Sequence, residues 1–143
     1  MKRFVLLTAL VASATSALAA PETYVIDSSR TSSQFSYRYL GLSNQTNRFE
    51  KIHGTLVFDR DSQSGSAQVI IDAASVNTGQ ALLDAQMKAV DFFDTANYPV
   101  ITFKSGKMSL TGDQSSLSGD LTIKDVTRPV TLAVTHFQCM QDP

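Results

Sequence analysis

The sequence predicts an all-β domain with one short helix, built as an antiparallel sheet that curls on itself. Apolar and polar residues alternate with a period of two in five separate segments, which places them on opposite faces of a strand. Polar stretches that contain glycine separate these segments, as hairpin loops require. Only one segment has helical spacing, so the regular crossover helices of a parallel α/β sheet are missing.

Each alternating segment predicts a strand with one apolar and one polar face. The segments are residues 34–39, 52–59, 101–104, 117–124 and 130–135. A further strand is predicted at residues 67–71, where the second half is apolar on both faces and is expected to be covered. Hairpin loops are expected at residues 59–65 and 111–114. Strands with one wet and one dry face, joined by short loops, are typical of antiparallel barrels.

One segment, residues 78–93, interrupts the strand pattern. Leu83, Met87 and Val90 recur at helical spacing, and Thr78 is available as an N-cap. The spacing therefore predicts a short helix followed by an irregular segment. Pro99 favours an extended backbone before it, so the next strand is expected to begin there.

The N-terminus has the pattern of an export signal. Basic residues 2–3 precede an apolar run at residues 4–12, and small residues end in the Ala-Leu-Ala of residues 17–19. A membrane-spanning helix needs about 20 apolar residues, more than this run supplies. We expect residues 1–19 to be a cleaved signal peptide and residues 20–143 to form one domain in the bacterial periplasm, without a stable membrane anchor.

Composition excludes two classes of partner. The chain has 12 basic and 13 acidic residues, a net charge of −1, and no basic cluster that would predict a nucleic-acid partner or an anionic membrane surface. Cys139 is the only cysteine, so no intramolecular disulfide can form. It is expected to be a buried, inert thiol rather than one that pairs between chains.

No catalytic constellation is recognisable. His53 and His136 are far apart in sequence without metal-ligand spacing, and His53 falls on a polar strand face. Asp91 and Asp94 bracket two phenylalanines, where we expect them to accept hydrogen bonds from backbone N–H groups and fix an irregular turn. The sequence therefore predicts no enzyme, no catalytic residue, no metal ligand and no cofactor.

Nine large apolar side chains are predicted to point to one side of the strands. They are Phe35, Tyr37, Leu56, Phe58, Phe92, Phe93, Phe103, Leu121 and Leu132. These side chains can fill a small barrel completely, or they can line a cavity for one small ligand. Periodicity alone leaves both interpretations open, the first being an exported interaction domain with a solid core.

Several short motifs occur in a fixed order across nearly the whole predicted domain. They are Tyr24-Val25-Ile26-Asp27, Phe49 before Gly54-Thr55-Leu56-Val57-Phe58-Asp59, Ser75-Val76-Asn77-Thr78-Gly79, Asp91-Phe92-Phe93-Asp94 leading to Tyr98-Pro99-Val100-Ile101-Thr102-Phe103, and Gly119-Asp120-Leu121-Thr122-Ile123 with Val126-Thr127-Arg128-Pro129-Val130. Together they resemble the YceI-like family of periplasmic proteins, described as polyisoprenoid-binding.

This resemblance implies a lipocalin-like barrel that holds an isoprenoid quinone or polyprenol, and it implies that a homodimer can form. The nine apolar residues above are then expected to line the lipid site, with Phe92 and Phe93 at its mouth. Family members typically continue past the point that corresponds to Pro143, with a hairpin that completes the barrel. We therefore expect a shortened barrel, incomplete at the C-terminus.

Overall fold

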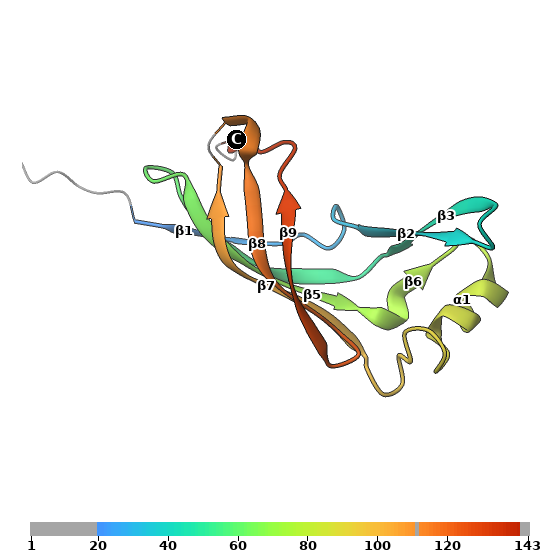
Figure 1. The fold of residues 1–143 in the computed structure, drawn as a ribbon. Helices are drawn as coiled ribbons and strands as arrows, with labels where there is room; N and C mark the ends of the chain where they lie inside the picture. Colours follow the sequence, from blue (N-terminus) through green and yellow to red (C-terminus); the bar gives the residue numbers. More distant parts are fainter. Residues whose placement is uncertain (1–19, 111, 141–143) are drawn as a thin grey trace, which may run out of the picture.

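The computed structural model describes residues 20–110 and 112–140, which form two antiparallel sheets and one α-helix (Figure 1). The large sheet has the strand order β1-β4-β5-β7-β8-β9, and the small sheet has the order β2-β3-β6. The strands are β1 Glu22–Val25, β2 Ser33–Tyr39, β3 Ser43–Phe49, β4 Ile52–Asp59, β5 Ser64–Asp72, β6 Val76–Asn77, β7 Val100–Ser109, β8 Ser116–Ile123 and β9 Val126–Ala133. The helix is α1 Ala81–Lys88, and 3-10 turns lie at Ala73–Ser75 and Gly112–Gln114. The predicted fold class is confirmed.

Hairpins build most of the large sheet. β4 pairs with β5 along its whole length across the polar loop at residues 60–63, where the sequence predicts a loop. β8 pairs with β9 across the two-residue turn Lys124-Asp125, which Ile123 and Val126 close. Both turn residues have positive φ, 50° and 61°, as a type I′ hairpin requires.

Two irregularities curl the large sheet. The β5–β7 ladder shifts register between Gly65 and Gln68, and the β7–β8 ladder shifts between Ser105 and Lys107. The buried Ser105 hydroxyl accepts a hydrogen bond of 2.6 Å from the Ala67 N–H, which satisfies that amide where the ladder is broken. Because such bulges bend a strand and increase its twist, the sheet curves as a barrel wall does.

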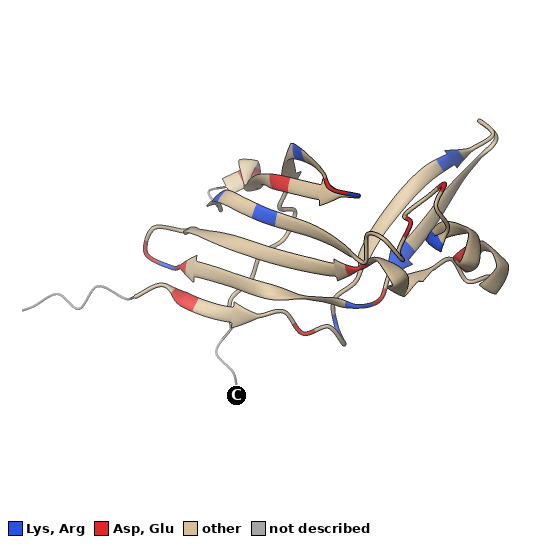
Figure 2. Cartoon of the chain, turned by 90° about the horizontal axis from the view of Figure 1, so that it is seen from below, with Lys and Arg blue, Asp and Glu red and all other residues tan. Residues whose placement is uncertain are grey.

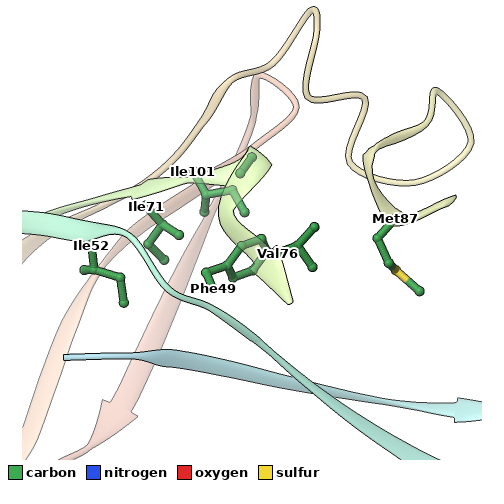
Figure 3. Packing of buried hydrophobic residues seen from close by; sticks show 7 residues of the cluster. Phe49, Ile52, Ile71, Val76, Met87 and Ile101 are labelled. Atoms are coloured by element: carbon green, nitrogen blue, oxygen red, sulfur yellow. The ribbon is translucent and has the colours of Figure 1, made fainter. Parts of the chain in front are cut away.

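The main hydrophobic core lies where the small sheet and α1 meet one end of the large sheet (Figure 1). Its buried members are Phe49, Ile52, Ile71, Ala73, Val76, Met87 and Ile101. Figure 3 shows these side chains converging from both sheets and from α1. Partly buried residues of several strands pack around them, so both sheets and the segment around α1 contribute to this core.

The helix begins later than its sequence pattern predicts. α1 starts at Ala81, its N-cap Gln80 makes no side-chain capping bond, and Val90 lies beyond its end. Thr78 instead donates its N–H and its hydroxyl to the Asp84 carboxylate, each at 2.7 Å. These two hydrogen bonds stabilise the charged carboxylate and lower the pKa of Asp84. The predicted N-cap role of Thr78 is therefore wrong, because the helix begins at Ala81 and Gln80 occupies the N-cap position.

The large sheet is open, which agrees with an incomplete barrel. β1 and β9 stand at its two edges, and most residues of β9 are exposed. The predicted cover over the second half of 67–71 is absent on one face, since Ile70 is 38% exposed. No helix in the described ranges has the length and apolar character to cross a bilayer. The predicted signal peptide, residues 1–19, lies outside the described residues.

Candidate functional site: the apolar inner face

Five of the nine predicted lining residues share one face of the large sheet, which we call the inner face. Phe103 of β7 lies between Val69 of β5 and Leu121 of β8. Leu56 opposes Ala67 across the β4–β5 ladder. The five residues are Leu56, Phe58, Phe103, Leu121 and Leu132. The period-two alternation therefore predicted correctly which side chains share a face.

The inner face is covered at one end and open along β8 and β9. Phe58 and Phe103 are buried, Leu56 and Leu121 are partly buried, and Leu132 is 47% exposed. The small sheet and α1 cover the end that holds the core, whereas no described strand lies beyond β9. A largely apolar surface thus runs from the covered end to the accessible edge, where Arg128 of β9 lies on the same face, opposite Leu121.

Three phenylalanines form an aromatic cluster at the covered end. Phe35 of β2 lies 5.2 Å from Phe49 of β3 and 5.3 Å from Phe93, measured between ring centroids. Phe49 and Phe93 are also 5.2 Å apart, and both contacts of Phe93 are edge-to-face. Tyr37 continues the row, 6.5 Å from Phe35 and nearly parallel to it. The structure therefore brings three of the predicted lining residues together with Phe49.

An irregular turn after α1 positions Phe93. The Phe93 N–H donates to the Met87 carbonyl, and the N–H of Asp94 donates to the Ala89 carbonyl. Asp94 is buried with a positive φ of 48°, and its carboxylate accepts two hydrogen bonds of 3.0 Å from the Asn97 side-chain amide. Residues 89–98 are therefore held by specific bonds, although the segment is neither helix nor strand.

The predicted roles of the two aspartates need correction. The Asp94 carboxylate fixes the turn through the Asn97 side chain and not through backbone N–H groups. Asp91 is exposed and accepts no such bond among the described residues. Phe92 is 40% exposed and lies outside the aromatic cluster, so the two neighbouring phenylalanines have different environments. Their contact with a ligand stays a prediction.

A second aromatic contact lies at the opposite end of the inner face. Phe58 and Phe137 pack with ring centroids 4.8 Å apart, beside a pocket of about 480 Å³ that we call the end pocket. The end pocket is lined by residues of the β4–β5 loop, the β7–β8 connection and the segment after β9, among them Arg60, Leu110 and His136. Its lining mixes polar and apolar groups.

A charged network borders the end pocket. Arg60 Nη2 lies 3.2 Å from Glu22 Oε2 and donates to the Tyr24 hydroxyl at 3.2 Å, and that hydroxyl donates to Glu22. The hydrogen bond from Tyr24, followed by the attraction of Arg60, lowers the pKa of Glu22. The same partners raise the pKa of Arg60. Because these side chains are largely exposed, the network orients the edge strand β1 but adds little stability.

The structure overturns the expected burial of the single thiol. Cys139 is exposed and lines the end pocket, because it lies in the extended segment after β9 and not in a strand. His53 is exposed, as its strand position predicts. Within residues 20–110 and 112–140, no three His, Cys, Asp or Glu side chains are grouped as metal ligands. Figure 2 shows that charged residues lie mostly at turns and strand ends.

Several residues that the structure buries on the apolar side are not among the nine predicted lining residues. Phe49, Ile101 and Met108 are all buried on the apolar side. Phe49 stands at the end of a strand whose other residues are polar, so the alternation is weak there. The sequence feature that could have predicted the burial of Phe49 was its place in a motif that resembles the YceI-like family.

The comparisons with known proteins agree on one family. Residues 24–142 match the sequence profile described as the YceI-like domain. The protein YceI of Escherichia coli O157:H7 is 36% identical over 110 residues, which are 76% of this chain and 58% of that protein. A UPF0312 protein of Pseudomonas aeruginosa (strain LESB58) is 32% identical over 111 residues, 77% of this chain and 58% of that one. The chain thus matches less than two thirds of these relatives' length.

Solved structures agree with the sequence match. BcnA of Burkholderia cenocepacia superposes with a TM-score of 0.67 at 30% identity, over 82% of this chain and 70% of that one. The YceI protein of Campylobacter jejuni gives a TM-score of 0.59 at 29% identity, over 76% and 64%. The curved sheet described above is therefore similar to that of experimentally determined proteins.

Proposed function

This chain belongs to the YceI-like family, and from that premise we propose that it binds an isoprenoid lipid, a quinone or a polyprenol. The lipid tail lies along the apolar inner face, between the aromatic cluster and the open edge at β9. The protein acts in the bacterial periplasm after export and carries, stores or senses the lipid. It performs no chemistry on its ligand.

The observation that carries this proposal is the continuity of the inner face. Apolar side chains of β4, β5, β7, β8 and β9 share it, and its charged positions lie on the two edge strands, where Glu22 of β1 opposes Phe58 and Arg128 of β9 opposes Leu121. A prenyl tail has no hydrogen-bonding groups, so apolar burial alone can hold it. At roughly 25 cal/mol per Å², a few hundred Å² of buried tail supply several kcal/mol before ordering costs.

The proposed periplasmic role follows from the same chemistry. A prenyl chain is insoluble in the aqueous space between two membranes, so it needs a container with an apolar interior and a polar exterior. The polar outer positions of the strands and the apolar inner positions meet this need. The proposed signal at residues 1–19 would deliver the protein to that space.

One observation favours a second candidate, an interaction domain without a lipid. The core beneath α1 is tightly filled, with Ile52, Phe49 and Met87 all buried. If the remaining inner face closes in the same way against a second copy or another protein, no lipid fits. The open surface along β8 and β9 would then be a protein interface.

Lipid extraction and mass spectrometry of the purified protein separate the two candidates. We expect one prenyl lipid per chain, or per homodimer, in extracts of protein purified without detergent. Native mass spectrometry of the same sample reports the mass of the bound ligand and the oligomeric state together. Protein recovered without any prenyl lipid, and unable to take one up from vesicles, would exclude lipid binding and favour the interaction domain.

A further inference from the structure

Asn47 is a buried residue whose side-chain nitrogen has no hydrogen-bond partner in the described part of the chain. It lies on β3 and is 4% exposed, and its Nδ2 finds no acceptor among the described residues. The other buried polar side chains of residues 20–110 and 112–140 have partners: Asp94 accepts from Asn97, and Ser105 accepts from the Ala67 N–H. Because a buried amide that forms no hydrogen bond is costly and rare, its presence needs a reason.

The position of Asn47 suggests that reason. It is the direct cross-strand partner of Phe35, and Phe49 lies two residues further on the same face of β3. Side chains two residues apart on a strand, and directly opposed across a ladder, are neighbours on one face. Asn47 therefore lies beside the aromatic cluster, at the covered end of the inner face, with its Nδ2 atom buried.

We propose that Asn47 Nδ2 donates a hydrogen bond to a neutral oxygen at the head of the bound isoprenoid. A quinone carbonyl and a prenol hydroxyl both supply such an oxygen. This inference rests on the proposed lipid binding and adds the position of the head group, beside the phenylalanines, with the tail directed along the inner face. The flat ring of a quinone also suits the aromatic surroundings.

The surroundings argue against a charged head group such as a prenyl phosphate. Arg48, the next residue, alternates to the opposite face of β3, where it pairs with Glu50 at 3.1 Å. No Lys or Arg side chain is buried within residues 20–110 and 112–140. A phosphate at Asn47 would therefore be buried without a counter-ion, which is far more costly than burying a neutral oxygen.

The test compares Asn47→Leu with the unchanged protein for four ligands: a prenyl quinone, a prenol, a prenyl phosphate and squalene, an isoprenoid hydrocarbon without oxygen. Partitioning from phosphatidylcholine vesicles to the purified full chain measures each affinity. We expect the variant to bind the oxygen-bearing neutral ligand about tenfold more weakly and squalene equally well. Of the quinone and the prenol, the ligand whose affinity falls more in the variant carries the head group that Asn47 binds. The unchanged protein should bind the phosphate more weakly than either neutral ligand.

A stability measurement separates a binding role from a structural one. Replacing an unpaired buried amide by an apolar side chain should leave the ligand-free protein equally or more stable in urea. Asn47→Ser, which retains a donor, provides a second variant if leucine does not fit. Loss of quinone affinity without loss of stability supports the inference. The carbonyl stretch of a labelled quinone should also shift on binding to the unchanged protein only.

Gln45→Leu is the matched control. Gln45 lies on the same face of β3, two residues earlier, but its amide already donates to the Ser43 hydroxyl at 3.1 Å. This variant should leave the ratio of quinone to squalene affinity unchanged. If Asn47→Leu also leaves that ratio unchanged, the head-group inference is wrong while lipid binding stands. If the unchanged protein binds neither squalene nor the quinone, the proposed function and the inference both fail.

Discussion

Phe92 and Phe93 are adjacent in sequence, yet their rings lie in different environments. Phe93 packs edge-to-face on Phe35 and Phe49, whereas Phe92 is exposed beside them. We expect Phe93→Ala to lower the free energy of unfolding by about 2–3 kcal/mol, because it removes a partly buried ring from the core. Phe92→Ala should change it by less than about 0.5 kcal/mol and should still weaken binding of a prenyl quinone.

Urea unfolding and vesicle partitioning of the two variants check this difference. Each phenylalanine serves as the control for the other, since the substitution and the chain segment are the same. Equal losses of stability would show that the ring environments do not differ as described. An unchanged quinone affinity in Phe92→Ala would remove Phe92 from the mouth of the lipid site.

At single positions, the sequence could predict which face of a strand a side chain occupies, but not whether other residues cover it. Phe58, Phe103 and Leu132 share the inner face as predicted, yet the first two are buried and the third is half exposed. Burial depends on what lies opposite, which alternation within one strand does not encode. The exposure of Cys139 has the same cause, because its segment lies beyond the last described strand.

Among the elements, the strands β7 and β8 leave no room for a side chain at Gly119. A Cβ at this residue would lie 2.4 Å from the Lys104 carbonyl oxygen and 2.5 Å from the Ser105 Cα, both in the backbone of β7. We expect Gly119→Ala to destabilise the protein by about 2–3 kcal/mol, since backbone must move to admit the methyl group. Thermal and urea unfolding measure the loss.

Gly106→Ala provides the comparison for that substitution. Gly106 lies in the neighbouring bulge of β7, and a Cβ there would meet nothing within 4 Å. Its replacement should change the free energy of unfolding by less than about 0.5 kcal/mol. Similar effects of both substitutions would mean that glycine is needed for flexibility and not for the close approach of two strands.

Element boundaries show where local sequence signals compete. The hairpin loop after β4 is specified by its polar residues and lies where predicted. The helix start was predicted at Thr78, but Gly79 takes a positive φ of 82° and Thr78 donates to Asp84. Strand β3 was missed because only Phe49 in it is apolar. Pairing with β2 and β6, and not its own periodicity, makes it a strand.

For the whole molecule, the family motifs carried more information than periodicity. The resemblance that they carry implied a barrel and, from the usual length of family members, an incomplete one; the structure has an open sheet with β1 and β9 at its edges. Periodicity could not predict that β2, β3 and β6 form a separate sheet, because strand order depends on contacts between distant segments. The head-group position at Asn47 was equally hidden, since an unpaired amide is recognisable only once its neighbours are placed.

The open edge at β9 makes a prediction about self-association. In a two-residue hairpin the closing pair, Ile123 and Val126, is hydrogen-bonded, so by alternation the nitrogen of Pro129 faces the free edge. Proline supplies no N–H there and so interrupts the row of donors that a second strand would need. We expect Pro129→Val to cause concentration-dependent self-association, which sedimentation velocity measures. Thr127→Val is the control, because it adds an apolar side chain on the same strand face but no N–H donor, and it should not cause self-association. Association of both variants to the same extent would show that apolar surface, and not the missing donor, limits pairing at this edge.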